Sequence, residues 1–166
     1  MQVYLVGFMG AGKSYLGNIL AEKWQLAFFD LDQLMAEKFQ QSIAEIFQEK
    51  GEAWFRQEES KLLLSWQQPG IIASGGGVIE LKKNREFLKQ QQVIWLDAEW
   101  NLLWQRIKDS QRPLVQILGE AGIRKLYEKR KPLYEMVADY QISSASLAVK
   151  EIDILSQEIW QKVSAQ

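Results

Sequence analysis

The segment Gly7–Ser14, with the sequence GFMGAGKS, constrains this chain more than any other feature. It matches the P-loop pattern G-x-x-x-x-G-K-[ST], and it lies between the β-rich run Val3–Val6 and a stretch with helical spacing of apolar residues. In such loops the glycines let backbone N–H groups surround phosphate oxygens, and the following helix dipole adds positive potential. A glycine-rich turn with an incidental lysine is the alternative, which the strand–loop–helix context disfavours. The segment therefore predicts a nucleotide-phosphate site, with Lys13 on the β- and γ-phosphates and Ser14 as a ligand of Mg²⁺.

Composition narrows the chemistry that can accompany this loop. The chain has 166 residues, which suits a single domain, and its formal net charge of -1 supplies no general attraction for nucleic acid or membranes. It has no cysteine, which excludes disulfides and thiolate metal sites. It also has no histidine, so acid–base work falls to carboxylates, lysine and arginine.

No apolar stretch approaches the length of a membrane span. The apolar start Met1–Phe8 is too short for the core of a signal peptide and lacks a basic leader. We therefore expect a cytoplasmic protein.

Strand-like and helix-like segments alternate along the chain, which predicts an α/β fold with a mainly parallel sheet covered on both faces. Parallel sheets bind ligands beyond the carboxyl ends of their strands, where both glycine clusters of this chain are expected to lie. The predicted strands are residues 3–6, 27–29, 71–73, 93–96 and 140–142.

The helical segments carry clear end signals. Ser42–Glu45 reads as a capping box, and the helix that it begins should end at Gly51. A polar stretch from Lys108 to about Glu120 has poor periodicity and suits a closing lid. The helical region after it should be interrupted at Pro132. Tryptophans fall mostly at apolar positions, which predicts that they belong to the core.

Asp30 and Asp32 end the second predicted strand. Residues two apart in extended chain point the same way, so both carboxylates can enter the ligand crevice. One can serve Mg²⁺ through water, and the other can orient or deprotonate a substrate hydroxyl. The alternative is that Asp32 simply caps the next helix.

Three arginines and a glycine cluster are further candidates. Arg56 can pair with Glu59 at i,i+3, which alone would be an ordinary surface ion pair, although the flanking aromatic residues suggest partial burial and an anionic partner. Arg112 lies in the predicted lid. Arg130 lies between lysines, so a solvated basic face is its simplest interpretation. Gly75–Gly77 permits close approach of a ligand to the backbone, or is a plain flexible turn.

In order and spacing, these elements resemble the shikimate kinase family. The resemblance rests on the P-loop, Asp30-x-Asp32, the segment Gly51–Glu59, the triple glycine, Arg112–Val115, and Arg130-x-x-x-Tyr134 followed by Ala138–Asp139. It extends from Met1 to about Ile142.

The resemblance implies a nucleoside-monophosphate-kinase-type, three-layer α/β/α fold. Its five-stranded parallel sheet would have the order 2-3-1-4-5, with a lid at about 108–120 and a substrate-binding helical subregion at about 32–62, in one domain over 1–166. The implied reaction is transfer of the γ-phosphate of ATP to the 3-hydroxyl of shikimate, on the route to chorismate and aromatic amino acids. The implied partners are ATP and shikimate, and the implied state is a monomer.

Site roles also follow from the resemblance. Phosphates would be held by Gly10, Ala11, Gly12, Lys13, Ser14 and Tyr15, and Mg²⁺ by Ser14 and, through water, Asp30. Asp32 would be the base and would bind the ring hydroxyls. Gly76 and Gly77 would contact shikimate, and Arg56 and Arg130 would clamp its carboxylate. Arg112 would close onto the phosphates, and Arg106 would lie against adenine.

Three positions depart from the family pattern. Tyr15 and Asn18 replace a small and an often basic residue after the P-loop, and Gln41 stands where glycine is usual. The segment 143–150 gives no clear match to an adenine loop. Two other functions stay open from the sequence: another small P-loop kinase, acting on gluconate or a nucleoside phosphate, and a non-catalytic binding protein of the same fold.

Overall fold

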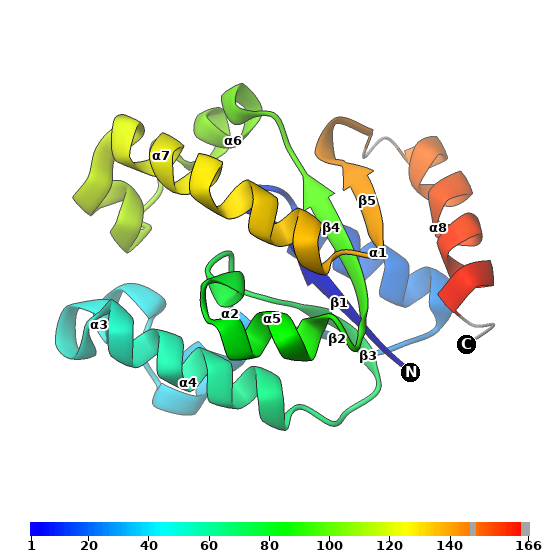
Figure 1. The fold of residues 1–166 in the computed structure, drawn as a ribbon, viewed down its shortest axis with the longest axis horizontal. Coiled ribbons are helices and arrows are strands. Elements are labelled where there is room, and N and C mark those ends of the chain that lie inside the picture. The colour runs from blue at the N-terminus through cyan, green and yellow to red at the C-terminus, as the bar shows by residue number, and fades with distance from the viewer. Residues whose placement is uncertain (147–148, 164–166) are drawn as a thin grey trace.

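The computed structural model describes residues 1–146 and 149–163. Its centre is a five-stranded sheet of order β2-β3-β1-β4-β5, in which all pairs are parallel (Figure 1). This confirms the predicted sheet and strand order. The strands are β1 (Gln2–Val6), β2 (Phe28–Asp30), β3 (Gly70–Ala73), β4 (Gln92–Asp97) and β5 (Tyr140–Ser143).

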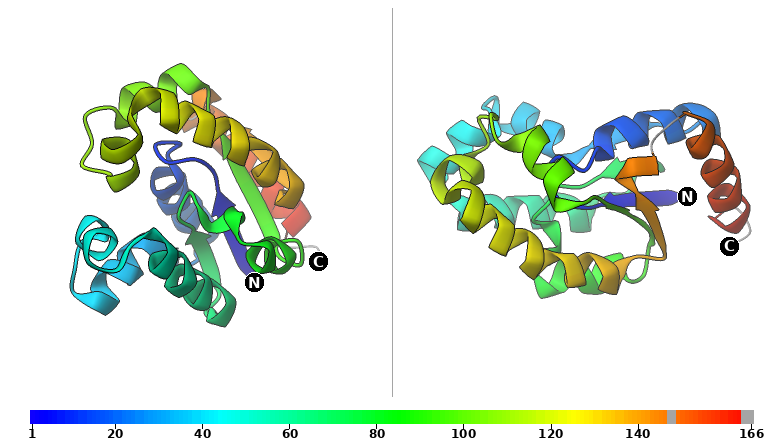
Figure 2. Two further views of the ribbon diagram at one scale, coloured as in Figure 1. Left: turned by 60° about the vertical axis from the view of Figure 1, so that its left-hand side comes forward. Right: turned by 90° about the horizontal axis from the view of Figure 1, so that it is seen from above.

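Helices cover both faces of the sheet, with α1 and α8 on one side and α5 and α7 on the other (Figure 2). The helices are α1 (Lys13–Trp24), α2 (Leu31–Phe39), α3 (Ile43–Lys50), α4 (Glu52–Ser65), α5 (Lys82–Leu88), α6 (Trp100–Ile107), α7 (Pro113–Val137) and α8 (Val149–Val163), with short 3-10 turns η1 (Val78–Glu80) and η2 (Ser144–Ser146). In the part of the chain that is described, no helix combines the length and the apolarity needed to cross a membrane.

The core explains why β1 and β4 read as continuous apolar runs. Val3–Val6 and Val93–Leu96 are almost fully buried, as expected for central strands of a parallel sheet with helices on both faces. Of the tryptophans, Trp24 and Trp95 are buried in the core, whereas the other five keep partial exposure. The prediction that tryptophans belong to the core thus holds fully for two of them.

Local sequence signals set several helix ends. Ser42 and Glu45 form the predicted capping box at the start of α3, and Gly51 ends this helix. The glycine usual at position 41 proves unnecessary because Gln40 takes the left-handed conformation, with φ 52°, as the C-cap of α2.

The long helix α7 departs from the prediction. Pro132 lies inside it without interrupting it, and the one non-helical position is Gly119, with φ 60° and ψ -175°. Proline removes one helical hydrogen bond, but the buried residues Arg130 and Tyr134 hold this part of α7 against the core on both sides of Pro132. The predicted lid, 108–120, is therefore a loop to Arg112 followed by one short helical segment that ends at Gly119.

We predict that Gly17→Ala destabilises the fold. Although alanine favours a helix by about 1 kcal/mol, a Cβ at this position would overlap the ring of Phe28. Overpacking of this kind costs about 1–3 kcal/mol, so a net loss is expected in urea denaturation. Glu22→Ala, at an exposed position of the same helix, should change stability by less than about 0.5 kcal/mol. A more stable Gly17→Ala variant would show that Phe28 moves aside freely.

Candidate functional site

Two cavities meet at the carboxyl edge of the sheet. The larger cavity, of about 550 Å³, lies between α3, α4 and the start of α7. The P-loop cavity, of about 480 Å³, lies over Gly10–Tyr15. Four residues line both cavities: Met9, Asp32, Gly76 and Arg112. The arrangement suits two ligands that meet end to end.

Strand order explains this convergence. β2, β3 and β1 are neighbours and run in the same direction, so their carboxyl ends lie side by side. The chain continues from β1 into the P-loop, from β2 into Asp32, and from β3 into Gly75–Gly77. Three segments distant in sequence therefore face one crevice, as the sequence predicted for the two glycine clusters.

The P-loop has the conformation that a phosphate site requires. Gly10 and Gly12 have positive φ, of 79° and 100°, which side chains other than glycine rarely adopt. Lys13 Nζ donates to the carbonyls of Gly7 (2.8 Å) and Phe8 (3.1 Å), so the ammonium lies across the loop. Burial lowers the pKa of Lys13 to about 8, against the opposing effect of Asp32. An anion in the cavity would restore the charged form.

Ala11 and Tyr15, two further residues assigned to the phosphates, differ in exposure. Ala11 is buried and does not line the cavity, so only its backbone belongs to the site. Tyr15 lines the cavity and is 54% exposed at its rim. Asn18, which differs from the family pattern, donates from Nδ2 to the Ser14 carbonyl (2.7 Å) inside α1. The differences from the family pattern at Tyr15 and Asn18 therefore leave the P-loop itself undisturbed.

Ser14 and Asp30 place two oxygen atoms together beside the P-loop. Ser14 Oγ donates to Asp30 Oδ2 at 2.6 Å, and both residues line the P-loop cavity. Hydroxyl and carboxylate oxygens are the ligands that Mg²⁺ prefers, usually with waters and phosphate oxygens completing its shell. This pair of oxygen ligands fits a divalent cation that is bound together with a nucleotide.

The helix cap after β2 is Asp30, not Asp32. Asp30 Oδ1 accepts from the backbone N–H groups of Asp32 (3.0 Å) and Gln33 (3.4 Å) at the start of α2. The alternative role of Asp32 as a cap is thus wrong, and so is the extended conformation assumed for the pair. Asp32 nevertheless lines both cavities. Its pKa is raised, mainly by burial and also by Asp30, which suits a group that accepts a proton.

The triple glycine is packed, not loose. A Cβ on Gly75 would overlap the carboxylates of Asp32 and Glu59, and one on Gly77 would overlap the Arg56 guanidinium. Gly76 lines both cavities, and its carbonyl accepts a hydrogen bond from the Tyr134 hydroxyl. The alternative of a plain flexible turn is therefore wrong, because charged side chains occupy the space that the Cβ of any other residue would need.

Arg56 forms the predicted pair with Glu59, but this pair is not on the surface. Arg56 Nη1 lies 2.9 Å from Glu59 Oε2, and the Glu59 side chain is 1% exposed. Nη2 and Nε contact Glu52 Oε1 at 3.3 and 3.4 Å. Burial raises the pKa of Glu59 to about 7 and outweighs the opposing effect of Arg56. Sequence reasoning saw Glu59 only as a partner of Arg56, although it stands in the cluster around Asp32.

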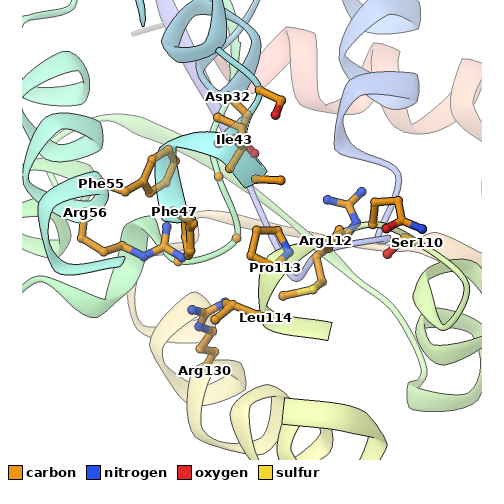
Figure 3. A pocket seen from close by; sticks show the side chains of 17 residues that line it. Asp32, Ile43, Phe47, Phe55, Arg56, Ser110, Arg112, Pro113, Leu114 and Arg130 are labelled. Carbon is orange, nitrogen blue, oxygen red and sulfur yellow. The ribbon is translucent and has the colours of Figure 1, made fainter. Parts of the chain in front are cut away.

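Arg130 contradicts its simplest interpretation, a solvated basic face. Its side chain is 1% exposed and lines the larger cavity, with Nε donating to Glu80 Oε1 at 3.0 Å. Nη1 and Nη2 are buried and have no hydrogen-bond partner among the described residues. Figure 3 shows Arg56 and Arg130 reaching into this cavity from α4 and α7, with Asp32 above them.

Arg112 and Arg106 are the two arginines that line the P-loop cavity. Arg112, the N-cap of α7, lines both cavities, which fits a group between two ligands. Arg106 Nη1 donates to Gly10 O (2.9 Å) and to Ser144 Oγ (3.0 Å), so it ties the P-loop to η2. The residues Leu147 and Ala148, in the segment without a clear adenine-loop match, lie outside the described part of the chain.

Two residues that support the site are not marked by the sequence as functional. Tyr134 contacts the lining residue Gly76 but stands in the sequence only as part of a motif, and Glu80 contacts the lining residue Arg130 although nothing near it in the sequence distinguishes it. The lining residues of the larger cavity that the sequence does not mark are mostly apolar: Ile43, Ala44, Phe47, Pro113 and Leu114. Apolar residues at helical spacing look the same whether they line a cavity or pack a core.

Comparisons with known proteins give one consistent result. A family model described as "Shikimate kinase" matches residues 9–163. The chain is 39% identical to a shikimate kinase of Synechococcus sp. (strain JA-3-3Ab), over 99% of this chain and 88% of that protein. It is 41% identical to a shikimate kinase of Lactococcus lactis subsp. lactis, over 96% of this chain and 98% of that protein.

A solved structure agrees in fold as well as in sequence. The shikimate kinase of Acinetobacter baumannii, in complex with shikimate, superposes with a TM-score of 0.85 at 38% identity. The match covers 99% of this chain and 93% of that one.

We predict that Glu59 makes stability depend on pH. Because its pKa rises from 4.5 to about 7 on folding, the folded chain binds this proton more tightly, and the resulting stabilisation is lost as pH rises through 7. Glu59→Gln removes the titrating carboxyl, so the stability of this variant should not show this pH dependence. Between pH 5 and 8 the wild type should therefore lose stability relative to this variant, on the order of 2 kcal/mol in urea denaturation. Glu49→Gln, at an exposed position, should follow the wild type. Parallel curves for Glu59→Gln and wild type would contradict the assignment.

Proposed function

The chain belongs to the shikimate kinase family, and from this premise we propose how its two cavities divide the family's reaction. It is an ATP-using phosphotransferase, which transfers the γ-phosphate of ATP to the 3-hydroxyl of shikimate. ATP would occupy the P-loop cavity and shikimate the larger one. The observation that carries this proposal is the set of four shared lining residues, because the reacting phosphate and hydroxyl must meet there.

In the P-loop cavity, we assign the phosphates to the backbone of Gly10–Tyr15 and to the Lys13 ammonium. The positive end of α1 and the N–H groups of the loop favour anions there. Ser14 and Asp30 would hold a divalent cation, which we propose to be Mg²⁺ and which would supply positive charge to the phosphate oxygens. Arg106, which already contacts the loop and η2, is assigned to the adenine side.

In the larger cavity, we assign Asp32 to the ring hydroxyls and to the reacting proton. Its raised pKa and its position between the cavities support this role. The backbone of Gly76 and Gly77 would contact shikimate. Arg130 offers two unpartnered nitrogens to the carboxylate, and Arg56 would complete the clamp.

Phosphoryl transfer asks mainly for positioning and for charge stabilisation. Arg112 at the shared edge would neutralise charge that develops on the transferred group. It begins the helical segment that ends at Gly119, so closure of the proposed lid at 108–120 would bring it down and exclude water. The region 32–62 would be the substrate-binding part of one domain over 1–166. The monomeric state and the cytoplasmic location stay predictions from the sequence.

The substrate assignment is tested by coupled measurement of ADP release with ATP·Mg²⁺ and four acceptors. Shikimate should support turnover, quinate should be far poorer, and gluconate and AMP should give no turnover above the ATPase background. AMP has no carboxylate for the arginines. Gluconate carries a carboxylate and hydroxyls, but on an open chain that does not hold them at the fixed separation of a ring, and quinate carries them on a saturated ring of different shape. Equal turnover of gluconate or AMP would contradict the assignment.

The carboxylate clamp is tested by Arg130→Lys and Arg56→Lys. Lysine cannot make a planar two-pronged contact, so shikimate affinity should fall by about ten- to a hundredfold in each variant. ATP affinity, measured without shikimate, should barely change. Arg124→Lys, at an exposed position of α7, serves as the control. Titration of tryptophan fluorescence can follow shikimate binding, since Trp54 lies two residues before Arg56 in the chain. Wild-type shikimate affinity in both variants would remove these arginines from the site.

A further inference from the structure

Glu80 stands outside every role assigned so far. It is the last residue of η1, the turn that follows the triple glycine, and its carboxylate is the one described partner of the Arg130 Nε. The Glu80 side chain is 24% exposed, whereas Arg130 is 1% exposed. The acidic group thus reaches from the edge of the molecule to a buried cation.

The contact decides which edge of the Arg130 guanidinium is free. A guanidinium is planar, so a partner on Nε sets the plane and direction of the whole group. Because Glu80 takes Nε, the buried Nη1 and Nη2 remain without partners in the described part of the chain, and Arg130 lines the larger cavity. A buried cation with one hydrogen-bond partner is costly, and a carboxylate received end-on by these two nitrogens would lower that cost.

Arg56, on the facing helix α4, is held differently. All three of its nitrogens already contact Glu52 or Glu59. Arg130 is therefore the cation of the pair whose two terminal nitrogens both lack a described partner, whereas Arg56 could receive an anion only through its remaining N–H groups.

Glu80 is itself firmly placed. Its backbone N–H donates to the Gly77 carbonyl (3.0 Å), and its own carbonyl accepts from Arg85 Nη1 (2.8 Å). Earlier in the same turn, the carbonyl of Val78 accepts from Nδ2 of the fully buried Asn84 (2.8 Å). A side chain on such an anchored turn can hold its partner in one orientation.

We propose that Glu80 is a positioning residue for shikimate binding: it holds the Nε edge of Arg130 so that Nη1 and Nη2 receive the substrate carboxylate end-on. This rests on the proposed role of Arg130. Glu80 does not touch the substrate, and it acts through the hydrogen bond that it accepts.

The charge of Glu80 works against this effect. A carboxylate beside the site repels the substrate anion, so removal of the charge alone should leave binding unchanged or tighter. Removal of the hydrogen bond should weaken it. The two contributions have opposite signs, and two substitutions separate them.

The experiment measures the dissociation constant of shikimate, together with KM and kcat, for Glu80→Ala and Glu80→Gln. Alanine removes the acceptor, and we expect shikimate to bind about tenfold more weakly, with a matching rise in KM and kcat within about twofold. Glutamine keeps an acceptor oxygen for Nε and should restore binding to within about threefold of wild type. ATP affinity should not change in either variant. Glu128→Gln, which removes the carboxylate of an exposed ion pair on α7, is the matched control and should behave as wild type.

A double-mutant cycle with Arg130→Lys distinguishes the possible failures. If Glu80 acts through Arg130, Glu80→Ala should cost less than about twofold in the Arg130→Lys background. Wild-type or tighter shikimate binding by Glu80→Ala would overturn the positioning role, and so would equal losses in the alanine and glutamine variants or additive losses in the cycle. If Arg130→Lys alone left shikimate affinity unchanged, the proposed role of Arg130 would fail first, independently of Glu80.

Discussion

The parallel pairing of β2, β3 and β1 is the constraint on which the site depends. Parallel neighbours end at the same edge, so the P-loop, the aspartate segment and the triple glycine face each other although they lie far apart in the chain. The P-loop and the triple glycine begin where the buried strands β1 and β3 end, and the aspartate segment begins where β2 passes directly into α2. The positions of Lys13, Asp32 and Gly76 therefore follow from the sheet, and little further structure is needed to bring them together.

The price of this arrangement is a group of charges held out of water. The side chains of Glu59 and Arg130 are each 1% exposed. Burial lowers the pKa of Lys13 and raises that of Glu59, and both shifts favour the neutral form. Isolated buried charges are costly, and here they are arranged as partners around the cavities. The glycines of the triple cluster leave the room that these charged side chains occupy. A site of this kind is stabilised most when its anionic ligands are bound.

α7 links the two halves of the site. Its first residues line the larger cavity near Arg112, and further along it Arg130 and Tyr134 contact Glu80 and Gly76. The last two contacts join one face of α7 to the segment after β3. In the proposed reaction, α7 would thus place Arg130, the proposed partner of the shikimate carboxylate, and would support the backbone of Gly76, which is proposed to contact shikimate.

The sequence alone determined the strand–helix alternation, the P-loop and the sequence positions of the aspartates, because these depend on local residue order and on short-range preferences. Through the resemblance it also indicated the strand order and the reaction. It could not decide how deeply Arg130 is buried, since the lysines beside it predict solvent exposure, nor that α7 passes through Pro132 and breaks at Gly119. It also could not reveal that Asp30 is the helix cap or that Glu80 pairs with Arg130. The Asp30 cap is a local contact, but both aspartates are good caps, so residue type alone could not choose between them. The burial of Arg130, the continuation of α7 through Pro132 and the Glu80–Arg130 pair depend on contacts between segments distant in the chain, and the energy of a long-range contact is not written in local sequence.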